Sequence, residues 1–150
     1  MRFQSNQANC GPAALRNALQ CHGVSRSEQE LEKLTGCSAA EGTTPRGILK
    51  ALTLVAKDHP EVSPGVINEG RENVALLQLL ESLRNGHVVI LLVDEWDHWV
   101  VAFGLLGSGS GIRIHLSDSA DAELIQHHTP KSILARWKGQ GRKPYYGIVV

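Results

Sequence analysis

The sequence predicts an α+β fold in which N-terminal helices pack on a mostly antiparallel C-terminal sheet. The main observation is a change of hydrophobic period. Apolar residues recur at helical spacing up to about residue 86, and from residue 88 they form continuous or alternating runs. A second observation is length, since 150 residues fit one domain, 1–150, with a proper core. Helical segments followed by strands are typical of the α+β class.

The first helix is expected from about Cys10 to His22, with Asn9 as its N-cap and Gly23 as the residue that ends it. Unpaired N–H groups and the positive end of the helix dipole favour a thiolate at Cys10. Gln4 lies six residues upstream and could reach the same site with its amide. A lone cysteine at a helix start is more often a small buried apolar residue, so a nucleophile requires a histidine partner elsewhere.

Each of the next three helices is marked by a capping signal. Ser27–Glu30 is a capping-box pattern, and its helix should end near Gly36. Thr44–Pro45 is typical of an N-cap followed by proline at the first helical position. The remainder of this half is expected to be a polar loop with Pro64, Gly65 and Gly70, then a leucine-rich helix capped by Asn73 and closed by Asn85–Gly86.

The second half is expected to hold four strands and one helix. Val88–Val93 is continuous and β-branched, as a strand buried on both faces would be. Residues 94–97 form the turn to a second strand, His98–Leu105. The glycine-rich segment Gly107–Gly111 is then a hairpin loop. The later elements are a third strand at Ile112–Leu116, a helix from Thr129–Pro130 through Trp137, and a final strand at Tyr145–Val150.

Hairpin geometry supplies the histidine partner. His98 opens the second strand, and Asp118 follows the third. Strands two and three form a hairpin, so the start of one lies beside the end of the other. This places Asp118 next to His98, where a carboxylate could hold the imidazole tautomer and stabilise the imidazolium. Each residue alone is ordinary, since the chain has seven histidines and Asp118 could be a turn residue.

With these residues in place, nearly the whole chain resembles the double-glycine-leader, bacteriocin-processing cysteine peptidase family, which has a papain-like fold. Three stretches carry the resemblance: Gln4 spaced six residues before Cys10, the run from Cys10 to Ala14, and the strand motif from His98 to Gly104. The resemblance implies Gln4 as an oxyanion-hole donor and Asp118 as the acid after the next strand. Ser119 stands where that family usually has proline, and Gly107–Gly111 lengthens the interval from histidine to aspartate.

Three functions follow from this pattern. The first is a cysteine endopeptidase in which Cys10 attacks a peptide carbonyl, His98 transfers the proton, Asp118 orients His98, and Gln4 binds the oxyanion. The second is amide chemistry on another acceptor, as in a transglutaminase or glutamine deamidase. The third is a non-catalytic peptide-binding module of the same fold, against which the intact set of four residues argues. The peptidase requires no cofactor.

The partners follow from the resemblance and from charge. The resemblance implies a peptide or protein substrate cut after two small residues, ideally Gly-Gly, and a link to a transporter. Trp96 is the better candidate for the wall of a narrow channel, and Trp99 should serve the core. Asp97 and Asp121 are the acids rejected in favour of Asp118.

Composition excludes several other classes. Lys+Arg and Asp+Glu are equal at 15 each, so we expect no nucleic-acid partner. The longest apolar run is too short for a membrane segment, and the N-terminal residues do not form a signal peptide. Three cysteines argue against a disulfide framework and for a cytoplasmic location. The cysteines lack paired metal-ligand spacing, and His127–His128 is expected in a solvated loop, so no metal site is predicted.

Overall fold

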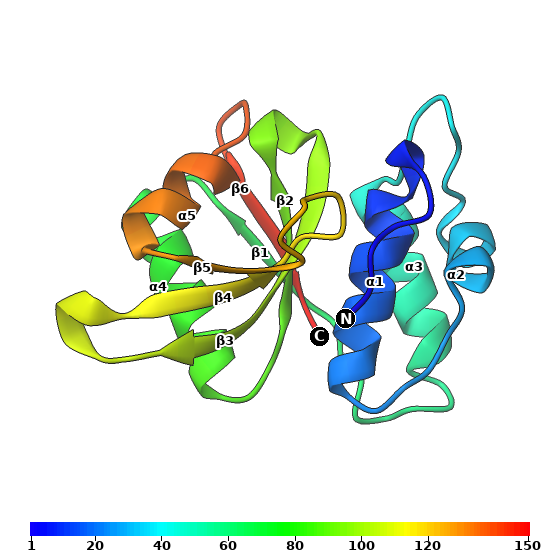
Figure 1. The fold of residues 1–150 in the computed structure, drawn as a ribbon, viewed down its shortest axis with the longest axis horizontal. Coiled ribbons are helices and arrows are strands. Elements are labelled where there is room, and N and C mark those ends of the chain that lie inside the picture. The colour runs from blue at the N-terminus through cyan, green and yellow to red at the C-terminus, as the bar shows by residue number, and fades with distance from the viewer.

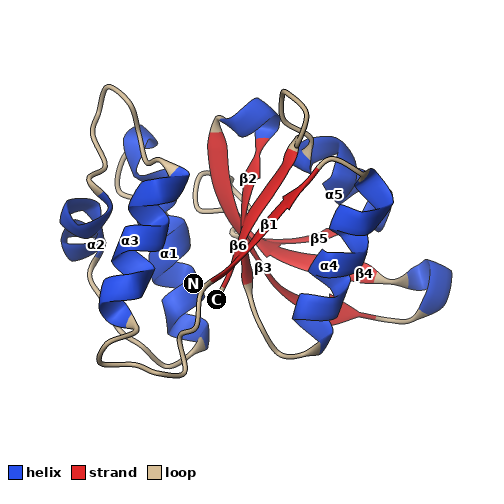
Figure 2. Ribbon diagram, turned by 180° about the vertical axis from the view of Figure 1, so that it is seen from behind, coloured by secondary structure: helices blue, strands red, loops and turns tan.

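A central sheet separates two groups of helices in the computed structural model, which describes all 150 residues. The helices α1, α2 and α3 gather on one side, and α4 and α5 cover the other (Figures 1 and 2). The helices are α1 (Cys10–Cys21), α2 (Glu28–Thr35), α3 (Pro45–Val55), α4 (Glu72–Arg84) and α5 (Pro130–Trp137), with short 3₁₀ turns η1 (Gln7–Asn9), η2 (Asp94–Trp96) and η3 (Gly109–Gly111).

The sheet has six strands in the order β1-β6-β2-β3-β4-β5, and every neighbouring pair is antiparallel. The strands are β1 (Gly65–Glu69), β2 (Val89–Val93), β3 (His98–Leu106), β4 (Arg113–Ser117), β5 (Ile125–His128) and β6 (Tyr145–Val149). The predicted α+β class is therefore confirmed, and the strands predicted from the sequence match β2, β3, β4 and β6 within a residue or two at each end.

Two apolar cores lie on opposite faces of the sheet, and alternate residues of β2 serve each. Ile90 and Leu92 pack with helices α1 to α3, whereas Leu91 and Val93 pack with α4 and α5. All five residues of β2 are buried. This explains why the strand is a continuous apolar run: neither of its faces meets solvent. Helix α1 contacts β3 across the first core.

Several predicted caps are present, and two are wrong. Ser27, Thr44 and Thr129 each accept a hydrogen bond from a backbone N–H in the first turn of the helix that follows. Asn9 caps nothing, because its side chain donates to Glu28 instead. Asn73 lies inside α4, which begins one residue earlier.

Two strands replace predicted loops, and both are edge strands. The polar loop around Gly65 holds β1, which pairs with β6 alone, and His127–His128 belongs to β5, which pairs with β4 alone. Edge strands are short and partly exposed, so their hydrophobic pattern is weak. These two strands are defined by backbone pairing with one neighbour, and the apolar pattern of the sequence does not indicate that pairing.

No helix in the structure combines the length and the apolar character that crossing a lipid bilayer requires.

Candidate active site

Cys10 lies at the head of α1 and lines an open cleft of about 340 Å³. Its exposed fraction is 8%, so the thiol is mostly enclosed. The 3₁₀ turn η1 leads into α1, and Asn6 Oδ1 caps that turn by accepting from the Ala8 N–H at 3.0 Å. Gly11 follows because a Cβ there would collide with Thr43. The head of the helix is thus packed directly against the loop that forms the opposite wall of the cleft.

The walls of the cleft come from both halves of the chain. One wall is the loop 39–43, and the other holds Trp96, Asp97 and Trp99 from the end of η2 and the start of β3. Trp99 is 2% exposed and donates from Nε1 to the Thr43 carbonyl at 2.9 Å, so it ties the two walls together. Trp96 is 43% exposed and also lines the cleft. Both tryptophans therefore border the space next to Cys10, and Trp99 also belongs to the core.

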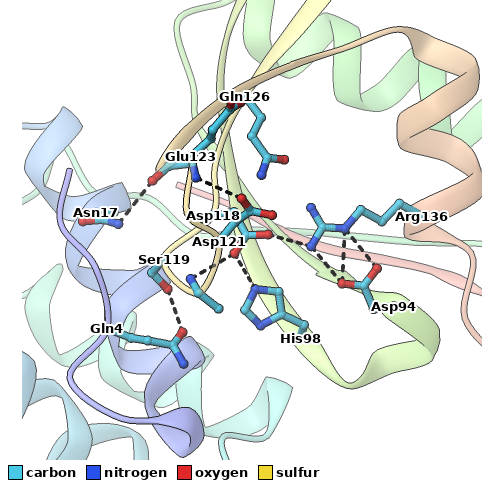
Figure 3. A network of polar contacts seen from close by, with 12 residues as sticks. Gln4, Asn17, Asp94, His98, Asp118, Ser119, Asp121, Glu123, Gln126 and Arg136 are labelled. Carbon is cyan, nitrogen blue, oxygen red and sulfur yellow. Dashed lines mark hydrogen bonds and ion pairs between the residues drawn. The ribbon is translucent and has the colours of Figure 1, made fainter.

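His98 and Asp118 are in direct contact. The imidazole Nε2 lies 2.7 Å from Asp118 Oδ1, and that oxygen also accepts from the Ala120 N–H at 3.1 Å (Figure 3). The register of β3 against β4 pairs Val101 with Ser117, which brings the start of one strand to the end of the other. Since Asp118 takes Nε2, Nδ1 is the ring nitrogen that remains for the Cys10 thiol.

The electrostatics of this pair favour the charged forms. Burial disfavours the imidazolium, but the bond to Asp118 and the neighbouring Cys10 thiol outweigh it and raise the pKa of His98 to about 9. Burial also acts against ionised Asp118, yet hydrogen bonds from His98, Arg136 and the Ala120 N–H hold the pKa of that carboxyl well below its usual range. A buried carboxylate that stays ionised can stabilise an imidazolium next to a thiolate.

Arg136 completes this network, and the sequence analysis missed it. Its Nη2 donates to Asp118 Oδ2 at 2.6 Å, while Nε and Nη2 bind Asp94 (Figure 3). The two carboxylates raise the pKa of the guanidinium despite its partial burial. Arg136 lies in α5, and this helix packs against the turn η2. No local motif marks it, because only the packing of α5 against η2 brings it to the site.

Gln4 is held near Asp118 by Ser119, the residue that follows Asp118 in the chain. Its backbone N–H donates to the Ser119 carbonyl at 3.1 Å, and Ser119 Oγ donates to Gln4 Oε1 at 2.9 Å (Figure 3). Gln4 Nε2 donates to the Asn6 carbonyl at 2.8 Å and makes a longer contact of 3.4 Å with the Gln7 carbonyl. Ser119, the departure from the family pattern, thus links the N-terminal segment to the acid of the pair.

A second buried carboxylate, Glu28, anchors the segment between Gln4 and Cys10. Glu28 Oε1 accepts from the Ser5 N–H and hydroxyl and from Asn9 Nδ2, and Oε2 pairs with Arg16 at 2.6 Å. These bonds lower the pKa of Glu28 although its burial acts the other way. The sequence marked Glu28 only as part of a capping pattern. In the structure it holds the turn that presents Cys10.

The other candidate acids and cysteines lie apart from the pair. Asp121 caps its own loop through the Glu123 N–H at 2.9 Å, and Asp97 lines the cleft with no side-chain bond. Burial raises the pKa of both Cys21 and Cys37, and their thiols donate to backbone carbonyls. No group of three or more His, Cys, Asp or Glu side chains is arranged to hold a metal ion.

Sequence comparison finds distant relatives and no matching family model. An uncharacterised protein of Methanothermobacter thermautotrophicus is 29% identical over 103 residues, and one of Methanothermobacter marburgensis is 31% identical over 102 residues. These matches cover 69% and 68% of this chain. They span only 62% and 61% of the two relatives, so the chain corresponds to about three fifths of their length.

Comparison with solved structures identifies the fold. The peptidase domain of Streptococcus ComA, a bifunctional ABC transporter of quorum sensing, superposes with a TM-score of 0.71 at 17% identity, covering 99% of this chain and 96% of that one. A double-glycine-motif protease from an AMS/PCAT transporter, in complex with its leader peptide, gives 0.66 at 16% identity, with 97% and 86% covered. A C39-like peptidase from Bacillus anthracis gives 0.67 at 13% identity, with 99% and 92% covered.

The chain therefore has the papain-like α+β fold of these peptidase domains. The resemblance to the double-glycine peptidases, drawn from the Cys10 and His98 motifs, is confirmed at the level of the fold.

Proposed function

We propose that this protein is a cysteine endopeptidase. One observation carries the proposal: a cysteine at the head of a helix lines a cleft next to a histidine whose Nε2 lies 2.7 Å from a buried aspartate. The helix head favours a thiolate at Cys10, and the raised pKa of His98 favours an imidazolium beside it. This is the charge arrangement that a thiol nucleophile needs before substrate arrives.

The reaction proceeds in two stages. The Cys10 thiolate attacks the peptide carbonyl, and His98 gives its proton to the amine as the C–N bond breaks, which leaves a thioester on Cys10. Water then attacks the thioester while His98 takes its proton, and the acid product and the thiolate are released. Asp118 orients the ring throughout, because its carboxylate fixes Nε2 and leaves Nδ1 for the reacting atoms.

The oxyanion is stabilised by Gln4 and by the backbone N–H of Cys10. Ser119 holds the carbonyl oxygen of the Gln4 side chain, and this fixes the direction of the amide nitrogen. That nitrogen carries two hydrogens and makes one short bond, to the Asn6 carbonyl at 2.8 Å. Its other contact is long, at 3.4 Å, so one N–H is free to exchange it for a developing negative charge.

The substrate is a peptide with two small residues, ideally Gly-Gly, before the scissile bond. Trp96 and Trp99 border the space beside Cys10, which disfavours a branched side chain next to the nucleophile. The leader-peptide complex of the AMS/PCAT protease supports a peptide ligand for this fold. By the same likeness we propose that the protein works with a transporter. All three cysteines are free, as is typical of a reducing compartment, so we place the reaction in the cytoplasm.

A peptide library digested in ¹⁸O-labelled water tests the proposal. Hydrolysis gives two fragments with one ¹⁸O in the new carboxyl group, and cleavage after Gly-Gly should dominate. Transglutamination would join peptides with loss of ammonia, and deamidation would leave the backbone intact. Wild-type protein and Cys10→Ala are compared by mass spectrometry. Products of amide transfer, or fragments that persist with Cys10→Ala, would reject the peptidase assignment.

A further inference from the structure

The turn before His98 has a strained backbone. Asp94, Glu95 and Trp96 have φ values of 54°, 58° and 75°, and they are the only residues other than glycine with positive φ. A bulky residue in the left-handed region is a marked exception, and three in succession persist only when their surroundings hold them. The same turn places Trp96 in the wall of the cleft and leads two residues later into His98.

Contacts on two sides of the turn keep it in place. At the last residue of the turn, the Trp96 indole N–H donates to the Pro144 carbonyl at 3.3 Å. The ring also covers Gly139, where a Cβ would collide with it. At the first residue of the turn, the Arg136 guanidinium binds both carboxylate oxygens of Asp94, with distances of 2.8 to 3.2 Å. Paired contacts of this kind fix direction as well as distance.

The same guanidinium also reaches the Asp118–His98 pair. Its Nη2 donates to Asp118 Oδ2 at 2.6 Å, and Asp118 Oδ1 binds His98 (Figure 3). Arg136 has an exposed fraction of 22% and Asp118 only 2%, so the contact is largely screened from water. One side chain therefore holds both the carboxylate that orients His98 and the turn from which His98 follows.

We propose that Arg136 is a positioning residue that fixes the Asp118 carboxylate and the Trp96 turn in one arrangement. The inference rests on the proposed function for the meaning of that arrangement, because Asp118 orients the catalytic base and Trp96 borders the cleft. Arg136 touches no reacting atom. Its planar group serves two carboxylates at once, which the single ammonium group of a lysine cannot do with the same geometry.

Two readouts separate the two contacts, and neither requires turnover. Trp96 is the only tryptophan open to solvent, since Trp99 and Trp137 are 2% and 0% exposed, so acrylamide quenching of fluorescence reports the turn. The ¹⁵N resonances of His98 report the charge of Asp118. Charged or titratable neighbours of this region are Cys10 beside His98, Asp94 beside Arg136, and His127 and His128 from β5, whose signals are assigned separately.

We expect Asp94→Asn to raise the quenching constant at least about twofold while the proton affinity of His98 stays nearly constant, since Arg136 keeps its bond to Asp118. Arg136→Met should raise quenching as well. It should also raise the proton affinity of His98 about tenfold, because Asp118 no longer shares its charge with a cation. The matched control is Arg26→Met, which removes a similarly exposed arginine paired with Glu30 and should change neither readout.

Arg136→Lys keeps the proposal testable if the methionine variant fails to fold. The lysine retains the charge near Asp118 but cannot hold both oxygens of Asp94, so quenching should rise while His98 titrates almost as in the wild type. Wild-type quenching in both Asp94→Asn and Arg136→Lys would overturn the proposal. An unchanged or lower proton affinity of His98 in folded Arg136→Met would also overturn it. Peptidase activity enters neither result, so a failed peptidase assignment is recognised separately.

Discussion

Gln4 has a proposed role in catalysis, as an oxyanion donor, although the hydrogen bonds of its side chain in the structure are structural. Its side chain is bound to Ser119, a buried residue of the loop after β4, and to the Asn6 carbonyl of the N-terminal segment. Gln4→Ala should lower kcat about 10²- to 10³-fold, because one oxyanion donor is lost, while the melting temperature falls only slightly. Steady-state kinetics and thermal unfolding are measured together. The control is Gln78→Ala on α4, and an unaltered kcat in Gln4→Ala removes Gln4 from the mechanism.

Asp118 and Asp121 are three residues apart, and only Asp118 contacts His98. Asp118→Asn replaces a buried carboxylate that binds His98 and Arg136, whereas Asp121→Asn changes a cap on an exposed loop. We expect the first substitution to reduce kcat far more, by up to about 10⁴-fold as in serine triads. An amide can still orient the ring, so the ranking of the two variants is the test. A larger loss for Asp121→Asn would contradict the assignment.

At the scale of single residues, the sequence indicated the candidate site residues that have a local signal. Cys10 is marked by its helix head, and His98 and Asp118 by the ends of a hairpin. Arg136, Ser119 and Glu28 act through partners far away in the chain, such as Gln4 at 115 residues from Ser119. No pattern within a window of sequence indicates such pairs.

The turn η2 is the element that should set selectivity. Trp96 lines the cleft beside Cys10, and under the proposed function it would restrict the space next to the scissile bond. Trp96→Ala should therefore relax the preference for Gly over Val at the nearer position, while cleavage of the Gly peptide changes little. The ratio of kcat/KM for the two peptides measures this. Leu77→Ala, which truncates an exposed apolar residue on α4, is the control, and an unchanged ratio in Trp96→Ala would exclude the turn as a wall.

Elements were predictable where the apolar pattern or a cap is strong. The buried strand β2 and the capped helices α2, α3 and α5 have such signals. The edge strands β1 and β5 do not, because each is defined by pairing with one neighbour. The positive φ values of residues 94–96 were equally hidden, since Asp, Glu and Trp do not favour that conformation and distant contacts impose it.

For the whole molecule, His98 and Asp118 predict how stability depends on pH. The pKa of folded His98 is about 9, above the ordinary 6.5, so its contribution is complete below pH 6.5 and is lost as the pH rises through 9. The pKa of Asp118 is lowered, so its contribution is present above its ordinary pKa of 3.8 and is lost at lower pH. Stability should therefore be greatest between these limits and decline toward pH 9.5.

Urea unfolding at pH 6 and pH 9.5 measures that decline. The wild type should lose clearly more free energy of unfolding across this interval than His98→Gln, in which the imidazolium is absent. His59→Gln is the matched control, because this histidine contacts a carboxylate at an exposed site far from the cleft. Equal losses in the wild type and His98→Gln would show that folding does not raise the pKa of His98.

The central claim is that the fold makes Cys10 a reactive thiolate, and alkylation by iodoacetamide at mildly acidic pH tests it most directly. The three cysteines serve as internal controls for one another, and peptide mapping by mass spectrometry gives the rate at each. We predict that Cys10 is labelled far faster than Cys21 and Cys37, whose pKa values are raised, and that His98→Gln abolishes the difference. Equal labelling of all three cysteines in the folded protein would contradict the account.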